Sequence, residues 1–201
     1  MFKQFSLIAA LLIFAVPALA QKGAEQPVLG ENQQITFFNG ATTVQFSNDF
    51  VGALNSLNIR VGRITPGPII RRAPSFPITS GSLDLSTLRG EILHSGGLRL
   101  YSATASVKLE SFIIDTTGDS IVLTGMVSAN GTIVGRIPLF DLTLPSSDDL
   151  YAGANIVTLN DVSVTLRPEA AGALNAVFET EAFTAGFPIG IANVRGLAFA
   201  S

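Results

Sequence analysis

Few side chains in this sequence could bind a ligand, and the only histidine, His94, is the first to consider. It stands in the stretch "RGEILHSGGLRLY" (89–101), which ends at Tyr101, one of two tyrosines in the chain. An imidazole can contact a bound ligand directly. Beside the glycines that follow it, His94 could instead end a strand or a bulge, with a ring nitrogen bonded to a backbone carbonyl and the glycines at positive φ. The residues alone leave both interpretations open.

The motifs of the common enzyme classes are missing from the sequence. It has no GxSxG elbow, no GxGxxG fingerprint, no phosphate-binding loop and no HExxH pair. With one histidine and no cysteine, a zinc site would need carboxylates, and no carboxylate cluster has ligand spacing. Asp115 and Asp119 in "DTTGDS" are typical of a hairpin turn rather than a calcium loop. We therefore predict a protein that is not an enzyme and that holds no metal through a cluster of its own.

The N-terminus predicts export from the cytoplasm. Lys3, the apolar run "FSLIAALLIFAV" and the small residues of "PALA" have the pattern of a signal peptide cleaved after Ala20. An uncleaved N-terminal anchor is the alternative. We expect residues 1–20 to be the signal peptide, 21–33 a flexible lead-in, and 34–201 a single domain. No later stretch is long and apolar enough for a membrane helix, so a secreted, periplasmic or cell-surface protein is predicted.

Composition limits the classes of partner and the means of stabilisation. Removal of the signal peptide takes away Lys3 and no acidic residue, which leaves 11 basic and 15 acidic residues, a net charge of −4. This balance does not favour nucleic acid. Without cysteine an exported chain has no disulfides, so its core must hold it together.

Four arginines, Arg60, Arg63, Arg71 and Arg72, lie in a segment of 13 residues that is rich in proline and glycine. They could form an anion-binding or surface-binding patch. They could also decorate an exposed loop, as arginines beside prolines often do.

The dominant pattern of the chain predicts an all-β fold, a mainly antiparallel sandwich or roll with two short α-helices. Val107 and Leu109 alternate with Lys108 and Glu110, as expected for a strand with one wet face. Helices are predicted at 47–57, after Ser47 or Asn48 as N-cap, and at 167–178, with Pro168 in the first turn. The segments that we expect to form strands are "QITFF", "TTVQF", "LRLYSATASVKLESFIID", "SIVLTGMVS", "GTIVGRIPLFDLTL", "NIVTLNDVSVTL" and "IGIANVRGLAF".

The two helical segments match each other at a shift of 120 residues. Gly52-Ala53-Leu54-Asn55 aligns with Gly172-Ala173-Leu174-Asn175 without a gap, and in each case the helix directly follows a strand. This suggests a pair of corner helices related by pseudo-symmetry, although a chance similarity is an alternative. Because glycine weakens a helix, its repetition predicts close backbone packing at Gly52 and Gly172.

Three stretches resemble the HtaA-type domain found in bacterial haem-uptake and surface proteins. They are "SFPITSGSLDLSTLRGEI", "GEILHSGGLRLYSATASVKLESFIID" and "VSVTLRPEAAGALNAVFETEAFTAGFPIG", in the family's order, and the similarity spans about residues 35–195. The resemblance implies a haem site in which a tyrosine phenolate binds the iron and a histidine, here His94, bonds to that tyrosine. The family's tyrosine lies on the first helix, where this chain has Phe50 and Ala53.

Three classes of function are therefore open. The leading one is a secreted binding or surface-interaction module of the HtaA-like type without haem. The sequence does not name the partner, and a cell-surface component and haem are both open. The second is a haem carrier with an unusual ligand, Tyr101 or His94. The third is a carrier of a small apolar ligand, suggested by 14 phenylalanines and a mean hydropathy of +0.46.

Overall fold

The computed structural model describes residues 33–144, 150–153 and 155–200. The predicted signal peptide and nearly all of the lead-in lie outside the described residues. The elements in chain order are β1 (Gln34–Phe46), α1 (Asn48–Ser56), β2 (Arg60–Ile64), β3 (Ile69–Ile70), β4 (Ala73–Asp84), β5 (Gly90–His94), β6 (Gly97–Tyr101), β7 (Ser106–Asp115), β8 (Ile121–Ala129), β9 (Thr132–Thr143), β10 (Leu150–Gly153), β11 (Ile156–Leu166), α2 (Pro168–Phe178) and β12 (Pro188–Ala200).

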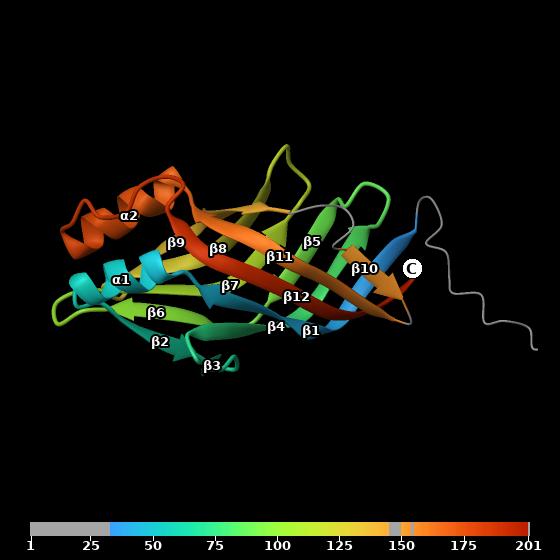
Figure 1. The fold of residues 1–201 in the computed structure, drawn as a ribbon, viewed down its shortest axis with the longest axis horizontal. Helices are drawn as coiled ribbons and strands as arrows, with labels where there is room; N and C mark the ends of the chain where they lie inside the picture. Colours follow the sequence, from blue (N-terminus) through green and yellow to red (C-terminus); the bar gives the residue numbers. More distant parts are fainter. Residues whose placement is uncertain (1–32, 145–149, 154, 201) are drawn as a thin grey trace, which may run out of the picture.

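The strands form an antiparallel sheet that closes on itself. Its order is β2-β6-β7-β5-β4-β1-β12-β11-β9-β8, and β8 pairs in turn with β7. Figure 1 shows the long strands running obliquely around one axis, with both helices at one end of the molecule. The predicted all-β class with two short helices is confirmed, and the sheet is a barrel-like form of the predicted sandwich or roll.

The barrel wall divides at β7. The first half of β7, Ser106–Glu110, pairs with β6, and residues further along, Ile113–Asp115, pair with β5. Beyond β5 the wall continues to β4 and β1, whereas the far side of β6 carries β2. In the described parts of the chain no ladder joins β2 to β4 or to β1. The wall is therefore open along β2, on the side where α1 follows β1.

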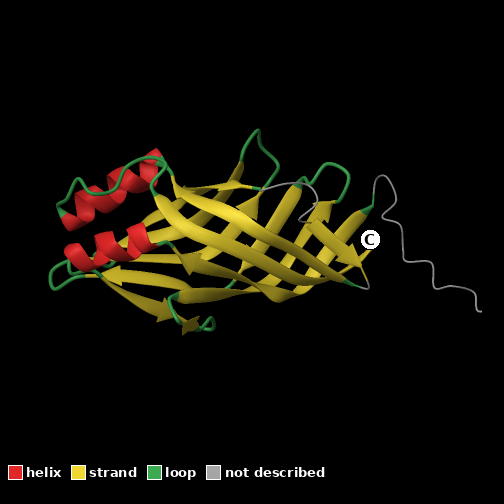
Figure 2. Ribbon diagram, viewed as in Figure 1, coloured by secondary structure: helices red, strands yellow, loops and turns green. Residues whose placement is uncertain are grey.

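Both helices begin where the sequence predicts. The hydroxyl of Ser47 accepts a hydrogen bond from the backbone N–H of Phe50 at 3.0 Å and donates one to the carbonyl of Pro188 at 2.6 Å. This N-cap starts α1 and also ties it to β12. Pro168 occupies the first turn of α2, where its missing N–H costs nothing. Figure 2 shows the two helices close to each other across the end of the barrel.

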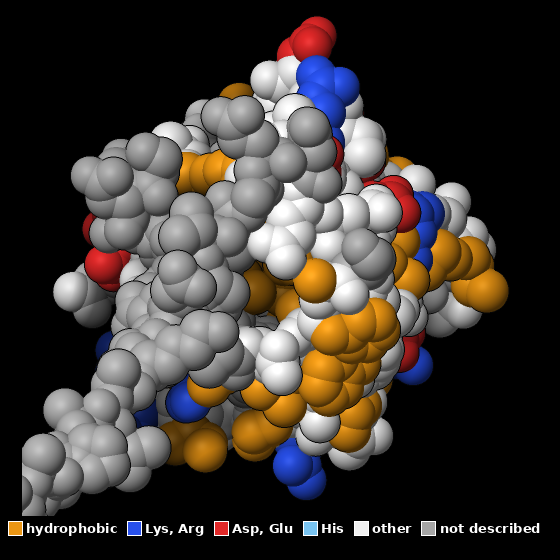
Figure 3. Space-filling view, turned by 90° about the vertical axis from the view of Figure 1, so that its right-hand side faces the viewer, with side chains coloured by type: hydrophobic (Ala, Val, Ile, Leu, Met, Phe, Trp, Pro, Cys, Tyr) orange, Lys and Arg blue, Asp and Glu red, His pale blue; other side chains and the backbone are white. Residues whose placement is uncertain are grey.

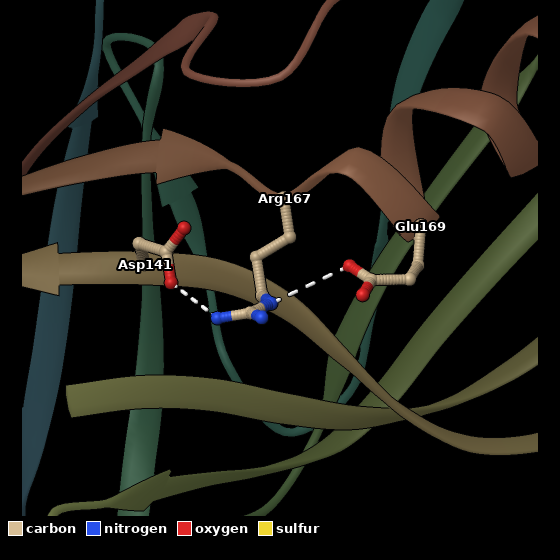
Figure 4. A network of polar contacts seen from close by, with 3 residues as sticks. All are labelled: Asp141, Arg167 and Glu169. Carbon is tan, nitrogen blue, oxygen red and sulfur yellow. Dashed lines mark hydrogen bonds and ion pairs between the residues drawn. The ribbon is translucent and has the colours of Figure 1, made fainter. Parts of the chain in front are cut away.

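An ionic network fixes the start of α2. The guanidinium of Arg167 donates from Nη1 to Oδ1 of Asp141 on β9, and its Nε lies 3.5 Å from Oε2 of Glu169 (Figure 4). The backbone N–H of Arg167 also donates to the carbonyl of Leu139 at 3.0 Å. The corner between β11 and α2 is thus held by both backbone and charge.

The core consists of two hydrophobic clusters. The larger lies under the helices and includes Phe50, Leu54, Leu166, Leu174 and Phe183. The smaller lies among β1, β4, β5, β7, β11 and β12 and consists of Ile35, Phe37, Ile78, Leu83, Ile92, Ile114, Val157, Val194 and Ala198. The period-2 pattern explains the division, since inward residues of β12 such as Ala192 and Val194 are buried while Asn193 and Arg195 are exposed.

Four strands between residues 60 and 94 were not predicted, and one predicted strand is two. Strand β4 contains Pro74 and Pro77, which obscure its pattern, and β2 and β3 are short. The predicted strand 98–115 is interrupted at residues 102–105, where the N–H of Ser102 donates to the carbonyl of Ala105. The hairpin turn predicted at "DTTGDS" is confirmed between β7 and β8.

The repeat is confirmed in position, but its glycines do not pack closely. The helices start 120 residues apart, at Asn48 and Pro168, and their strands β1 and β11 flank β12 from either side. A Cβ added to Gly52 or to Gly172 would meet no atom within 4 Å. The expectation of close backbone packing was therefore wrong, because these positions face solvent.

Leu54→Asp and Leu174→Asp should each destabilise the protein by more than about 4 kcal/mol, because each would bury a carboxylate in the main core. Gly172→Ala is the matched control in the same helix and should stabilise by about 0.5–1 kcal/mol. Chemical denaturation followed by circular dichroism measures both. A Gly172→Ala variant that loses stability would contradict the open environment described above.

Candidate functional site

His94 lies inside the barrel at the end of β5 and is 5 % exposed. Its Nε2 is 2.8 Å from the hydroxyl oxygen of Thr42 on β1, and this bond passes across β4, which lies between the two strands. Thr42 and His94 are the two buried polar residues of the described chain. The bond partner is thus a side-chain hydroxyl and not the backbone carbonyl that the sequence suggested.

The glycines after His94 have different roles. Gly96 has a φ of +78°, as expected, and lets the chain turn from β5 into β6. Gly97 lacks a positive φ, and a Cβ there would lie 2.1 Å from the carbonyl oxygen of Leu109. Gly97 is therefore needed for the close approach of β6 to β7. Together the two residues hold His94 in the barrel wall.

The surroundings of His94 keep its ring neutral. Its Nδ1 has no hydrogen-bond partner in the described structure. The residue lines a cavity of about 50 Å³ with apolar walls that include Phe76, Phe112 and Ile189. Desolvation by burial lowers the pKa of His94 to about 4, while the backbone carbonyls of Phe112 and Ile92 act weakly in the opposite direction. The imidazole is uncharged at neutral pH.

The barrel interior has little room for a ligand. A second apolar cavity, also of about 50 Å³, shares Ile114, Leu142 and Ala192 with the first. Sites for small organic ligands usually enclose about 300–1,000 Å³. The phenylalanines near these cavities pack against each other, as Phe76 does edge-on against Phe112 with ring centroids 4.9 Å apart. The interior around His94 is therefore packed core.

Tyr101 lies outside this core, at the end of β6. It pairs across the ladder with Arg60 of β2, and the guanidinium carbon of Arg99 lies 5.0 Å from the centroid of its ring. A Cβ at Gly62 would be 3.4 Å from the ring, so the phenol covers this glycine. The side chain is half-buried and well supported by its neighbours.

A large concave surface, which we call the α1 groove, runs along the open side of β2. It consists of two overlapping cavities of about 450 and 480 Å³ that share Asn55, Ile59, Arg60 and Tyr101. Its apolar part is formed by Phe46, Val51, Leu54, Ile59, Val61 and Ile69. Its other polar lining comes from Asn58, Arg72 and Ser102.

Two arginines of the groove have no acidic partner. Within the described residues the ion pairs involve Arg167 alone, so Arg60 and Arg72 are free of carboxylates. Arg72 follows β3, and its carbonyl accepts a hydrogen bond from the N–H of Phe46. The groove thus combines an apolar floor, a phenol and two uncompensated positive charges.

The two copies of the repeat differ at their asparagine. Asn175 of α2 uses its amide to bond both the N–H and the carbonyl of Phe183, at 3.1 and 2.8 Å, which fixes the segment after the helix. The equivalent Asn55 of α1 is exposed and lines the groove. Asn55 is therefore available to a ligand.

The structure separates the two candidate residues from the sequence. His94 lines an interior cavity and bonds to Thr42, whereas Tyr101 lines the α1 groove. A bond between His94 and Tyr101, as the resemblance implied for its histidine and tyrosine, is not formed. On α1, Phe50 is buried in the core and Ala53 is half-buried. The part of each in ligand binding stays a prediction.

The groove was only partly predictable from the sequence. Of the four arginines that the sequence suggested as a patch, Arg60 and Arg72 line the groove. Arg63 and Arg71 are exposed and do not line it. Asn55 and Ile59 were not identified as site residues. Only the repeat, which aligns Asn55 with Asn175, could have drawn attention to Asn55. Tyr151, the other tyrosine, lies on β10 and not in a loop.

No metal-binding group of three or more histidine or acidic side chains is present among the described residues. Over the same residues, no helix has the length and apolar character needed to cross a membrane.

Comparisons with known proteins identify the fold. No protein-family model and no curated protein gives a match to the sequence. Among solved structures, the C-terminal domain of HtaA from Corynebacterium glutamicum matches with a TM-score of 0.65 and 15% identity, over 82% of this chain and 99% of that one. This chain has the fold of an HtaA-type domain.

Two more structures with the HtaA-type fold support this. The N-terminal domain of HtaA from the same organism matches with a TM-score of 0.60 and 14% identity, over 80% of this chain and 97% of that domain. The haem-binding protein HtaB from Corynebacterium glutamicum matches with a TM-score of 0.50 and 12% identity, over 84% and 97%. The predicted resemblance is thereby confirmed at the level of fold.

The pKa of His94 predicts a loss of stability in mild acid. The unfolded chain takes up the proton near pH 6.5, whereas the folded chain resists it down to about pH 4. Stability is therefore complete above pH 6.5 and falls as the pH drops from 6.5 to 4, by roughly 3 kcal/mol in all. Urea titrations at several pH values measure this slope.

His94→Gln is the control, because it removes the titrating group. Its stability should be flat between pH 6.5 and 4. The pKa values of Asp84 and Asp115 are lowered from 3.8, chiefly by the hydroxyls of Ser86 and Thr117. Below about pH 4 the parent and His94→Gln should therefore lose stability in parallel. An equal slope in both proteins above pH 4 would contradict the assignment to His94.

Proposed function

We propose that this protein is a secreted, non-enzymatic binding module and that the α1 groove holds its ligand. The observation that carries the proposal is the composition of the groove, in which an apolar floor adjoins Tyr101, Arg60 and Arg72. A ligand that matches it has an apolar body and at least one carboxylate or phosphate. The signal-peptide pattern of residues 1–20 supports export.

Haem is the specific ligand to test in this groove. It is flat and apolar with two carboxylates, and a structure of the same fold is that of a haem-binding protein. The groove volume of about 450–480 Å³ lies within the range of cofactor sites. The residues present fit this group: the Tyr101 phenol is a suitable oxygen ligand for ferric iron, and Arg60 and Arg72 suit carboxylates.

The role of each residue follows from its chemistry. Tyr101 would hold the iron, and Arg99 packs over its ring and supports its position. Arg60 and Arg72 would orient the carboxylates, while Ile59 and Phe46 cover the apolar body and exclude water. Haem would supply a ferric centre for binding and transport. His94 would take no direct part, since it faces the core.

Titration of the purified protein with ferric haem tests the proposal. We expect a one-to-one complex with the charge-transfer absorption of phenolate-bound ferric iron, and Tyr101→Phe should abolish that absorption. Tyr151→Phe, at the other tyrosine, is the matched control and should have no effect. Arg60→Gln and Arg72→Gln should each raise the Kd about tenfold, because a charge-assisted hydrogen bond contributes about 1.5–3 kcal/mol.

Binding that is weak and not stoichiometric, or that Tyr101→Phe leaves unchanged, would contradict haem binding in the groove. It would favour the other class, a surface-interaction module without haem. Arg195→Gln, on the outer face of β12, controls for the general effect of removing an arginine.

A further inference from the structure

Exposed basic side chains concentrate on a few neighbouring elements of this acidic protein. Six of the ten lysines and arginines in the described chain lie on β2, β6, β7 and the turn after β3. They are Arg60, Arg63, Arg71, Arg72, Arg99 and Lys108; we call this set without Arg63 the basic face, because Arg63 pairs with the buried Leu98 and so lies on the other face of β2. All six are exposed, and none forms an ion pair within the described residues. In a chain whose predicted mature net charge is −4, such a concentration marks a surface for an anionic partner.

Strand register places part of the basic face on a continuous surface. Arg99 of β6 lies directly opposite Lys108 of β7, and Arg60 of β2 lies opposite Tyr101. Like charges directly across a ladder are unfavourable, so the Arg99–Lys108 pair costs stability unless an anion covers it. Glu110, two residues beyond Lys108, is the acid on the same side of β7.

A projecting apolar side chain lies beside these charges. Ile70 is 64 % exposed at the end of β3, and Arg71 and Arg72 follow it at once with φ values of +49° and +65°. These left-handed conformations make the tight turn into β4, which Figure 1 shows extending from the barrel near β2. An isoleucine held at a turn beside two cations can enter the headgroup region of a bilayer while the arginines meet phosphates.

We propose that the basic face docks the protein on an anionic lipid surface, with Ile70 inserted. A dissolved polyanion would use the charges alone and leave Ile70 in water, so the isoleucine favours lipid as the partner. Arg60, Arg72 and Tyr101 also line the α1 groove, so docking brings the groove mouth to the membrane. The proposal does not depend on which ligand the groove holds.

Vesicle flotation tests the docking. The purified protein should bind vesicles of phosphatidylcholine with phosphatidylglycerol and ignore vesicles of phosphatidylcholine alone. Binding should weaken as added salt shortens the Debye length. Arg71→Gln and Lys108→Gln should each weaken binding about fivefold, and Ile70→Ser should weaken it at least as much. None of the three residues lines the groove, so ligand binding should be unchanged in these variants.

The controls lie on β12, away from the basic face: Arg195 in the middle of the strand and Phe199 near its end, at the end of the barrel far from the helices. Figure 3 looks at that end and shows hydrophobic side chains gathered on it; the exposed rings of Phe38 and Phe199 lie 5.9 Å apart there. Phe199→Ser and Arg195→Gln should leave vesicle binding unchanged. Equal losses in these controls would assign the contact to the other end and overturn the proposal. So would an Ile70→Ser variant that floats as well as the parent, or equal binding to neutral vesicles.

Discussion

Strand β7 has to satisfy three neighbours, and most of the molecule follows from how it does so. Residues Ser106–Glu110 of β7 pair with β6, and residues Ile113–Asp115 pair with β5. The opposite edge of β7 pairs with β8, which closes the barrel. Gly97 allows the close contact between β6 and β7. Strands β5 and β6 pair with the same edge of β7, so only one of them can belong to the closed ring. That strand is β5, and β6 leads outward to β2. The barrel is therefore tight inside and open along β2, and the concave surface forms outside the core.

Electrostatics divides the polar residues in the same way. In the interior, neutral His94 and Thr42 satisfy one bond in apolar surroundings, where a charge would be costly. At the corner of α2, Arg167 is paired with Asp141 and Glu169, and its charge serves the fold. The arginines around the open side of β2 lack such partners. Unpaired charge next to exposed apolar surface is better explained by binding than by stability.

The sequence predicted the parts of the structure that local chemistry determines. Ser47 and Pro168 specify helix starts by their own hydrogen bonding and ring geometry, and the alternation of Val107 and Leu109 with Lys108 and Glu110 reveals β7. The strands between residues 60 and 94 were not predicted. Pro74 and Pro77 interrupt the alternating pattern of β4, and its hydrogen-bonded ladders to β1 and β5 stabilise it as a strand. Pairing between strands so far apart in the chain cannot be recognised from the local sequence.

The site was predictable only in part for the same reason. Tyr101 and the arginine stretch could be identified by residue type, but their meeting in one groove depends on the β2–β6 ladder. The partner of His94 is 52 residues away, on a strand separated from β5 by β4. No spacing rule connects such residues. The glycines of the helices misled because Gly52 and Gly172 face open space.

The attachment of β2 has a consequence for the motions of the protein. A strand within the barrel is held by ladders on both edges, whereas β2 is held by β6 alone. Detaching β2 breaks one set of backbone bonds and leaves the closed ring intact, so this segment should open at a lower free energy than global unfolding. Its amide protons should exchange with solvent sooner than those of β12. The barrel thus serves as a rigid frame, and the wall of the groove is the part that can yield to admit a ligand.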